Sequence, residues 1–267
     1  VQGMCEEWIE LFGDRLFGED RAISAGFARI GSTRFLLIGS RKGKEAREKV
    51  ACNFGCANPE GYRKALSKMK LAERFGLPRW QFAMTATDAN RFVLRWLRAA
   101  TGRRVLLVFN GCYHGTVDET FVRLVDGRVV HRPGLLGQVT DLTQLARVVE
   151  FNDVDGLRRE LAHGDVACVI TEPVLTNSCM VLPEPGFLDQ LRRCTRETGT
   201  LLLIDETHTI SSGPGGYTRA HGLEPDLFVL GKPIAGGVPA SVWGFTDDVA
   251  RRLHEVRAQT SPGHSGM

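Results

Sequence analysis

Residues 200–208 read Thr-Leu-Leu-Leu-Ile-Asp-Glu-Thr-His, an apolar run that ends in two acids. A continuous apolar run of this length is typical of a β-strand that is buried on both faces. An acid at the end of such a strand needs a positive or hydrogen-bonding partner, because burying an unpaired carboxylate costs free energy. We therefore predict a strand over Thr200–Ile204 that presents Asp205 at its carboxyl end.

Other segments of the chain have the same character and alternate with helical patterns. Further strands are predicted over Arg104–Phe109, Val166–Thr171 and Leu227–Leu230, and helices over Asp88–Ala100 and Phe187–Thr198. Strands that are apolar on both faces and alternate with helices indicate a mostly parallel sheet covered on both sides. The predicted fold class is therefore α/β, with a mostly parallel sheet and helices on both faces.

Each predicted strand leads into residues that can do chemistry. Glu172 follows Val166–Thr171, the pair Tyr113-His114 follows Arg104–Phe109, and Lys232 follows Leu227–Leu230. Parallel sheets bind ligands at the carboxyl ends of their strands, so these side chains and Asp205 should meet at one edge. A lysine in an apolar setting is a potential nucleophile.

Taken singly, these residues have ordinary structural explanations. An Asp after a strand is more often a helix cap or a turn residue, and a Lys before Pro is more often exposed to solvent. A Tyr-His pair in a loop is usually structural. The order and spacing of the whole set favour a shared site.

Composition narrows the class of protein. The 267 residues suit one large α/β domain or two small ones, with 43% hydrophobic and 24% charged residues as in ordinary globular proteins. The net charge of +3 is small and its basic residues are mixed with acids, which argues against a nucleic-acid partner. No apolar run approaches the roughly 20 residues that span a bilayer, and Val1–Glu10 lacks the order of a signal peptide.

The seven cysteines are spread along the chain. Cys52 and Cys56 are four residues apart, but no second Cys/His pair completes a zinc set, so we predict no metal site. We expect reduced, mostly buried thiols in a cytoplasmic protein.

The segments after the strands carry a family pattern. In chain order they are Thr85-Ala86-Thr87-Asp88-Ala89-Asn90, Tyr113-His114-Gly115, Glu172-Pro173, Asp205-Glu206 and Gly231-Lys232. Together they resemble the class III aminotransferases of fold type I, which use pyridoxal 5'-phosphate (PLP). The closest resemblance is to the branch that contains glutamate-1-semialdehyde aminomutase, and it covers about residues 71–267. It implies PLP as the cofactor and a fold type I large domain.

The resemblance also implies catalytic roles. Lys232 would form a Schiff base with PLP and move a proton between substrate and cofactor. Asp205 would pair with the pyridinium nitrogen, and Glu172 would lie near the substrate. Tyr113 would stack on the cofactor ring, with His114 beside it.

The remaining cofactor contacts follow from the same resemblance. Asn177 falls where the family places a group near the ring oxygen, and Thr207 where it usually has a Val against the other ring face. Thr85, Ala86 and Thr87 would bind the phosphate through backbone N–H groups at a helix N-terminus. The family has Ser-Gly-Thr there, so Thr85 and Ala86 depart from its pattern.

The implied reaction is amino-group transfer or an intramolecular amino shift. Its substrates would be small molecules, namely an amino acid and an amino-aldehyde or keto acid. The resemblance further implies a homodimer if the core folds, and no nucleic-acid or membrane partner.

The first part of the chain resembles another family. Its motifs are Phe12-Gly13-Asp14-Arg15, Gly18-Glu19-Asp20, Asn53-Phe54-Gly55 and Pro59-Glu60-Gly61-Tyr62. Over about residues 10–78 the sequence resembles the α subunit of bacterial acetyl-CoA carboxylase carboxyltransferase, which implies a crotonase-like α/β fragment. A hairpin is predicted there from Phe27–Ile30 and Arg34–Gly39, and a helix over Tyr62–Phe75.

We therefore predict a mosaic chain. Residues 1–75 would be the carboxyltransferase-α-like fragment, and residues 76–267 a truncated aminotransferase large domain. The truncated part should lack the family's N-terminal segment and its small C-terminal domain. The alternatives are a catalytically inactive fusion or fragment, or a carboxyltransferase α-like subunit, although that family's glycine-rich oxyanion segments do not follow the helix.

Overall fold

The computed structural model describes residues 6–10, 12, 18–30, 33–71, 79–213, 215–235 and 240–259. Its contacts divide the chain into two compact units. The larger unit holds Gln81–Gly231 and Ser241–Met267, and the smaller holds Val1–Trp80 and Lys232–Ala240. The domain boundary predicted between residues 75 and 76 lies in the stretch 72–78, outside the described residues.

A seven-stranded sheet forms the centre of the larger unit, with the strand order β4-β12-β11-β10-β9-β5-β8. The strands from β8 to β11 in this order pair in parallel, and β12 pairs with β11 in antiparallel. Their bounds are β4 (Arg79–Ala83), β5 (Val105–Phe109), β8 (Ala146–Val149), β9 (Val166–Thr171), β10 (Leu201–Asp205), β11 (Leu227–Leu230) and β12 (Ser241–Phe245). A mostly parallel sheet is what the sequence predicts.

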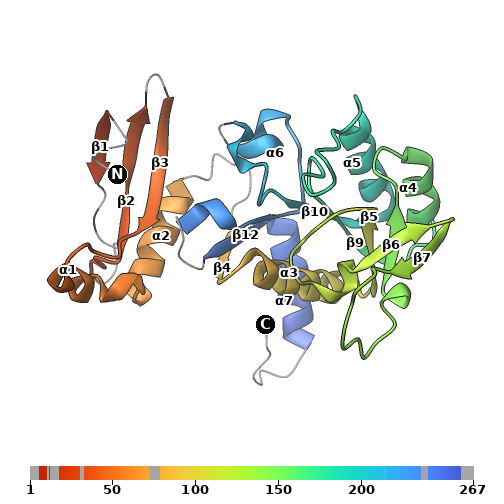
Figure 1. Ribbon diagram of the computed structural model, residues 1–267, viewed down its shortest axis with the longest axis horizontal. Coiled ribbons are helices and arrows are strands. Elements are labelled where there is room, and N and C mark those ends of the chain that lie inside the picture. Colours follow the sequence, from red (N-terminus) through yellow and green to blue (C-terminus); the bar gives the residue numbers. More distant parts are fainter. Residues whose placement is uncertain are drawn as a thin grey trace. The chain divides into compact units, whose positions relative to one another are not determined.

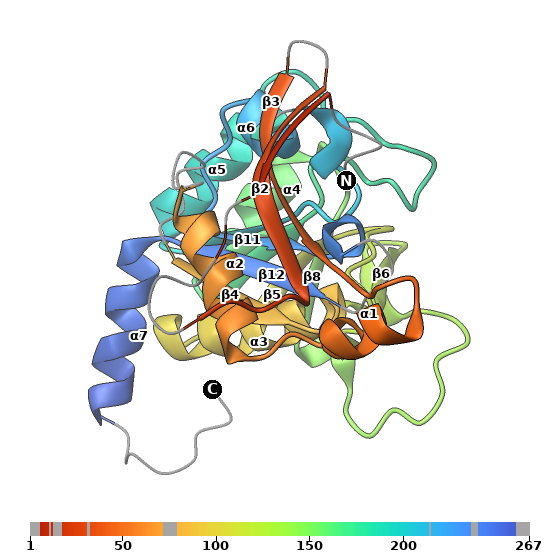
Figure 2. The same cartoon turned by 90° about the vertical axis from the view of Figure 1, so that its left-hand side faces the viewer.

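Helices cover both faces of this sheet, as Figures 1 and 2 show. On one face lie α3 (Ala86–Thr101) and α7 (Asp247–Gln259), which contact each other, and on the other lie α4 (Val154–Leu161) and α5 (Phe187–Thr198). Every residue of β9 and β10 is buried between these layers. The apolar strands thus have the two-sided cover that their composition predicts.

Local sequence explains where α3 begins and ends. The helix starts at Ala86, two residues before the predicted start, because the hydroxyl of Thr85 accepts a hydrogen bond from the backbone N–H of Asp88 at 3.1 Å. It ends at Thr101, and the following Gly102 has a φ of 67°, in the left-handed region that glycine adopts readily. The capped start places the first turn of α3 at the edge of the sheet.

Smaller elements complete the larger unit. They are the hairpin β6 (Val122–Val125) and β7 (Arg128–His131), the short helix α6 (Gly216–Ala220), and the 3-10 turns η3 (Asp118–Thr120), η4 (Leu142–Gln144) and η5 (Ile210–Ser212). The short strands β6, β7, β8 and β12 were not predicted from the sequence.

The smaller unit contains a three-stranded antiparallel sheet, β1 (Glu7–Glu10), β2 (Ile23–Ile30) and β3 (Thr33–Ser40). Strands β2 and β3 confirm the predicted hairpin. The other elements are α1 (Ala46–Ala51), η1 (Asn53–Gly55), α2 (Pro59–Leu71) and η6 (Lys232–Ala235), and η6 contacts β3. Helix α2 confirms the helix predicted after Pro59, whose last four residues, 72–75, lie outside the described residues.

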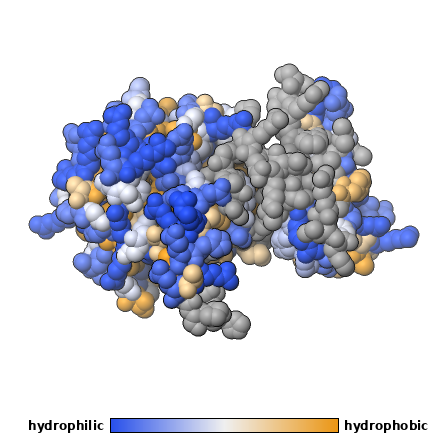
Figure 3. All heavy atoms as spheres, turned by 180° about the vertical axis from the view of Figure 1, so that it is seen from behind, coloured by the Kyte–Doolittle hydropathy of each residue, from blue (hydrophilic) through white to orange (hydrophobic). Residues whose placement is uncertain are grey.

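The described surface is mostly hydrophilic on the face shown in Figure 3, and its apolar residues lie in small scattered groups. None of the helices in the described ranges is both long and apolar enough to cross a membrane.

Candidate active site

Asp205 ends β10 and lies in a cluster of polar side chains on the α3 side of the sheet. Its Oδ2 atom accepts hydrogen bonds from Nδ1 of His114 and from Nδ2 of Asn90, both at 3.0 Å. Its Oδ1 atom accepts from the backbone N–H of Thr207 at 3.1 Å and from the Thr207 hydroxyl at 2.6 Å. The side chains of Asp205 and His114 are 4% and 0% exposed. The buried acid thus has the partners that burial demands.

The electrostatics of this cluster favour two opposite charges. Burial by itself lowers the pKa of His114, but the Cys112 sulfur and the Asp205 carboxylate beside the ring outweigh burial and raise this pKa to about 10. Burial by itself raises the pKa of Asp205, but hydrogen bonds from His114, Thr207 and Asn90 outweigh it, and the pKa is lowered. These shifts favour opposite charges on Asp205 and His114, and Nε2 of His114 is buried without a hydrogen-bond partner among the described residues.

The segment Thr85-Ala86-Thr87 lies at the start of α3, as predicted. The Thr85 hydroxyl donates to Oδ2 of Asp88 at 2.8 Å, and the Thr87 hydroxyl accepts from the backbone N–H of Thr116 at 3.2 Å. The backbone N–H groups of Ala86 and Thr87 belong to the first helical turn, where the helix supplies no carbonyl partner. Together with the helix dipole, these donors suit an anion.

Gly231 explains why the chain can have Ala86 where the family pattern has Gly. The backbone of Gly231 passes so close to α3 that a Cβ atom on it would lie 2.7 Å from the Cβ of Ala86. Only a glycine leaves room for the Ala86 methyl group. The departure from the family pattern is therefore accommodated by the residue that precedes Lys232.

Glu172 and Tyr113 come together at the same edge. Glu172 follows β9 directly and is 3% exposed. Its Oε1 atom accepts from the backbone N–H of Tyr113 at 3.2 Å, and its Oε2 atom accepts from the Thr176 hydroxyl at 2.8 Å. Tyr113 is 40% exposed.

Two further predicted residues are exposed to solvent. Asn177 is exposed in the loop after β9. Lys232 begins η6, directly after Gly231, and has an exposed side chain and a φ of 30°, which is uncommon for a residue other than glycine. The contacts assign Lys232 to the smaller unit, whereas every other predicted site residue belongs to the larger one.

The structure adds residues that the sequence prediction missed. Asn90 bonds both Asp205 and, at 3.2 Å, the backbone carbonyl of His114. A signal for it exists, because Asn90 is a polar residue among the buried apolar positions Ala89, Val93 and Leu94 of α3. Glu206 is also buried, and its carboxylate accepts from the backbone N–H groups of Tyr217 and Thr218 at the start of α6.

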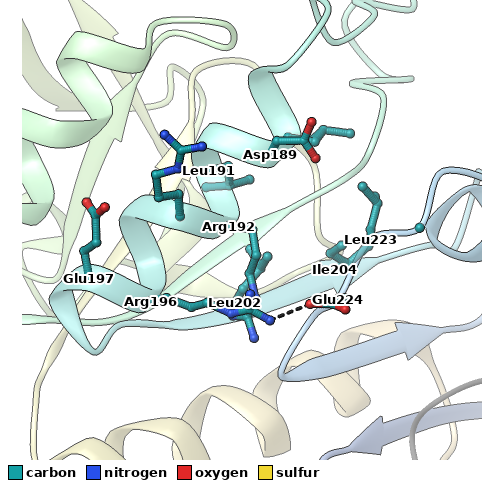
Figure 4. Close-up of a pocket in the computed structure, with 12 residues that line it drawn as sticks. Asp189, Leu191, Arg192, Arg196, Glu197, Leu202, Ile204, Leu223 and Glu224 are labelled. Carbon is teal, nitrogen blue, oxygen red and sulfur yellow. Dashed lines mark hydrogen bonds and ion pairs between the residues drawn. The ribbon is translucent and has the colours of Figure 1, made fainter.

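A pocket of about 330 Å³ lies on the other face of β10, between that strand, α5 and the segment 222–224 (Figure 4). Leu202 and Ile204 line it, and because side chains alternate along a strand, Asp205 points to the opposite face. Two of its arginines have acidic partners: Arg192 binds Asp226 at 2.7 and 2.9 Å, and Arg196 binds Glu224, as the dashed line in Figure 4 shows. This pocket contains none of the predicted site residues.

Across the described part of the chain, no group of three or more His, Cys, Asp or Glu residues could hold a metal ion.

Comparisons with known proteins match this chain to two different families. A family model for proteins described as "Acetyl co-enzyme A carboxylase carboxyltransferase-like" matches residues 1–89. It confirms the resemblance predicted for the first part and reaches beyond residue 78 into the start of α3.

The curated relatives match a larger share of the chain. Glutamate-1-semialdehyde 2,1-aminomutase of Syntrophomonas wolfei is 38% identical over 179 residues, which are 63% of this chain and 40% of the relative. Glutamate-1-semialdehyde 2,1-aminomutase 2 of Shouchella clausii is 36% identical over 216 residues, 79% of this chain and 49% of the relative. The chain thus spans less than half the length of these relatives.

Solved structures confirm the predicted fold class. A glutamate-1-semialdehyde aminomutase from Pseudomonas aeruginosa PAO1 has a TM-score of 0.71 and 52% identity, over 75% of this chain and 45% of that chain. A variant of that enzyme, crystallised in complex with PMP, also has a TM-score of 0.71. An ω-transaminase from Sphaerobacter thermophilus shares the fold at 24% identity, with a TM-score of 0.68 over 94% of this chain and 61% of that chain. The larger unit therefore resembles class III PLP-dependent aminotransferases of fold type I.

Proposed function

We propose that this protein is a PLP-dependent enzyme that transfers an amino group, or shifts one within a molecule, with Lys232 as the residue that bonds to the cofactor. The observation that carries the proposal is the buried Asp205–His114 pair at the carboxyl end of β10. The aminomutases and aminotransferases that match the chain support it. Catalytic roles are proposed for Lys232, Asp205 and Glu172.

The residues of the larger unit fit the cofactor. When bound, PLP supplies a ring that accepts electrons from the substrate carbon bearing the amino group, and it does so best when its ring nitrogen is protonated. Asp205 is buried and held in its charged form, so it would keep a proton on that nitrogen. His114 and Asn90 fix the orientation of the carboxylate.

Other residues of the chain would hold the cofactor in place. The first turn of α3, with Thr85, Ala86 and Thr87, would bind the phosphate through its backbone N–H groups. Tyr113 and Thr207 would lie on opposite faces of the ring, and Asn177 near its oxygen.

The absorbance spectrum of the purified protein tests the proposal. A lysine-bound cofactor absorbs in the visible, and borohydride should remove the band and leave a pyridoxyl mass on the peptide that contains Lys232. Lys232→Ala should lack the band while keeping the far-UV circular dichroism of the parent. A label on any other lysine would contradict the assignment.

We also propose a domain organisation and setting for the chain. Residues 1–75 would form a crotonase-like fragment of the carboxyltransferase α type, which the family match to residues 1–89 supports, and residues 76–267 the aminotransferase large domain. The protein would be cytoplasmic and homodimeric, acting on small amino and keto compounds. Light scattering after size-exclusion chromatography measures the dimer, and a monomer at micromolar concentration would contradict it.

A further inference from the structure

A hydrogen-bonded chain of three side chains joins the carboxyl ends of β9 and β10. Glu172 is buried directly after β9, and its Oε2 atom accepts from the hydroxyl of Thr176 at 2.8 Å and from the backbone N–H of Thr176 at 3.3 Å. The same hydroxyl oxygen forms a hydrogen bond with Nδ1 of His208. His208 lies three residues after Asp205 and is exposed.

The backbone donors determine the direction of these bonds. The N–H groups of Tyr113 and Thr176 can only donate, so both oxygens of Glu172 act as acceptors. The single hydroxyl hydrogen of Thr176 therefore points to Glu172, and its oxygen accepts from His208. Nδ1 of His208 must then carry a hydrogen, which leaves Nε2 of the neutral ring with its lone pair.

This chain of bonds belongs to the same edge of the sheet as the Asp205 cluster. Glu172 binds the backbone of Tyr113, and the next residue, His114, pairs with Asp205. His208 is thus an exposed imidazole with a defined tautomer, held beside the candidate active site by a buried carboxylate.

We infer that His208 accepts a proton from the ammonium group of an incoming amino donor, and that Glu172 and Thr176 are positioning residues that hold His208 in the Nδ1–H tautomer. This inference rests on the proposed function. In the step, one N–H bond of the ammonium breaks, a bond between that hydrogen and Nε2 forms, and the amine keeps the electron pair. The positive charge moves to the imidazole, where the carboxylate of Glu172 stabilises it through Thr176. The neutral amine is then a nucleophile.

Nitrogen-15 NMR of the full-length protein tests the tautomer without any cofactor. At a pH where the ring is neutral, the His208 signals should show the hydrogen on Nδ1. Thr176→Ser keeps the hydroxyl and should keep this pattern. Thr176→Val has nearly the same volume but no hydroxyl, and it should move hydrogen to Nε2, while the signals of His163 stay unchanged. Finding the hydrogen on Nε2 in the parent would overturn the inference.

Kinetics test the proton transfer. His208→Ala should lower kcat/KM for the amino donor about 100-fold at neutral pH. The loss should shrink as the pH approaches the pKa of the donor's own ammonium group, because the donor then arrives already neutral. His163→Ala, a histidine outside the site, should match the parent at every pH.

These experiments distinguish a failure of this inference from a failure of the proposed function. A loss in His208→Ala that is equal at all pH values would overturn the proton-accepting role, even with the cofactor bound. A parent without a visible band would overturn the proposed function, and the role of His208 with it, whatever the NMR shows.

Discussion

Strand β10 has an ionic cluster on each of its two faces, and the two clusters differ in burial. On the α3 face, the pair Asp205–His114 has side-chain exposures of 4% and 0%. On the α5 face, around the pocket of Figure 4, the pair Arg192–Asp226 has exposures of 18% and 16%, and the pair Arg196–Glu224 has exposures of 57% and 67%. A charged pair in water gains little from its contact, whereas a charge in the dry interior depends on its partner. Burial, more than the contact itself, therefore distinguishes the candidate site from the ordinary pocket.

The largest expected effect is that of Asp205→Asn on turnover. The amide keeps the shape of the side chain but removes the negative charge, so it cannot hold a proton on the cofactor nitrogen. We expect some cofactor to remain bound and kcat to fall by about 10²–10³-fold in an assay in which the parent transaminates. Near-parental activity in this variant would disprove the role of the buried pair.

The same variant should lose stability in a pH-dependent way. Removing one partner of a buried pair costs about 3–5 kcal/mol. The pKa of Asp205 is lowered in the folded protein, so this group contributes stability above its unfolded pKa of about 4. The pKa of His114 is raised, so its contribution to stability is full below its unfolded pKa of about 6.5 and is lost as the pH rises through about 10. The free-energy difference between parent and Asp205→Asn, from urea unfolding, should be largest at about pH 4–6.5 and decline towards pH 10. A difference that is constant from pH 5 to 10 would argue against a buried ion pair.

A smaller loss of stability is expected for a substitution where β11 meets α3. Gly231→Ala brings a methyl group against Ala86, and such overpacking costs about 1–3 kcal/mol. The double variant with Ala86→Gly should recover most of this stability, because it removes the methyl group that the new side chain meets. Thermal unfolding of both variants measures the effect. Without recovery, the contact between Gly231 and Ala86 would not be the cause.

The smallest change in stability is expected for the exposed ion pair at the pocket of Figure 4. Arg196→Ala removes an exposed ion pair, so the free energy of unfolding should change by about 0.5 kcal/mol or less, and the change should shrink further in high salt. Chemical denaturation at low and high salt measures it. A loss of several kcal/mol in the free energy of unfolding would show that this exposed pair contributes as much as a buried one.

Local patterns were enough to predict much of this fold. The apolar runs 166–171 and 227–230 are the strands β9 and β11, and the segment 187–198 is α5. These elements are long or strongly apolar, so their neighbours in sequence specify them. Strand β8 has only four residues, Ala-Arg-Val-Val, and owes its strand conformation to the parallel strand β5 beside it. A pairing between segments that are distant in sequence leaves little local signal.

The sequence by itself determined the main apolar strands, the start of α3 to within two residues, and the residue types that follow the strands. It could not determine which of those residues bond to one another. Asp205 and His114 are 91 residues apart, and Asn90 is 115 residues from Asp205. The parallel order of the strands brings Asp205 and His114 to one edge of the sheet, and the packing of α3 on the sheet brings Asn90 to them. Burial between α3 and the sheet opposes the charges of the pair, and the hydrogen bonds and charges of the neighbouring groups favour them, because the energy of an ionised group depends on the solvent and partners around it.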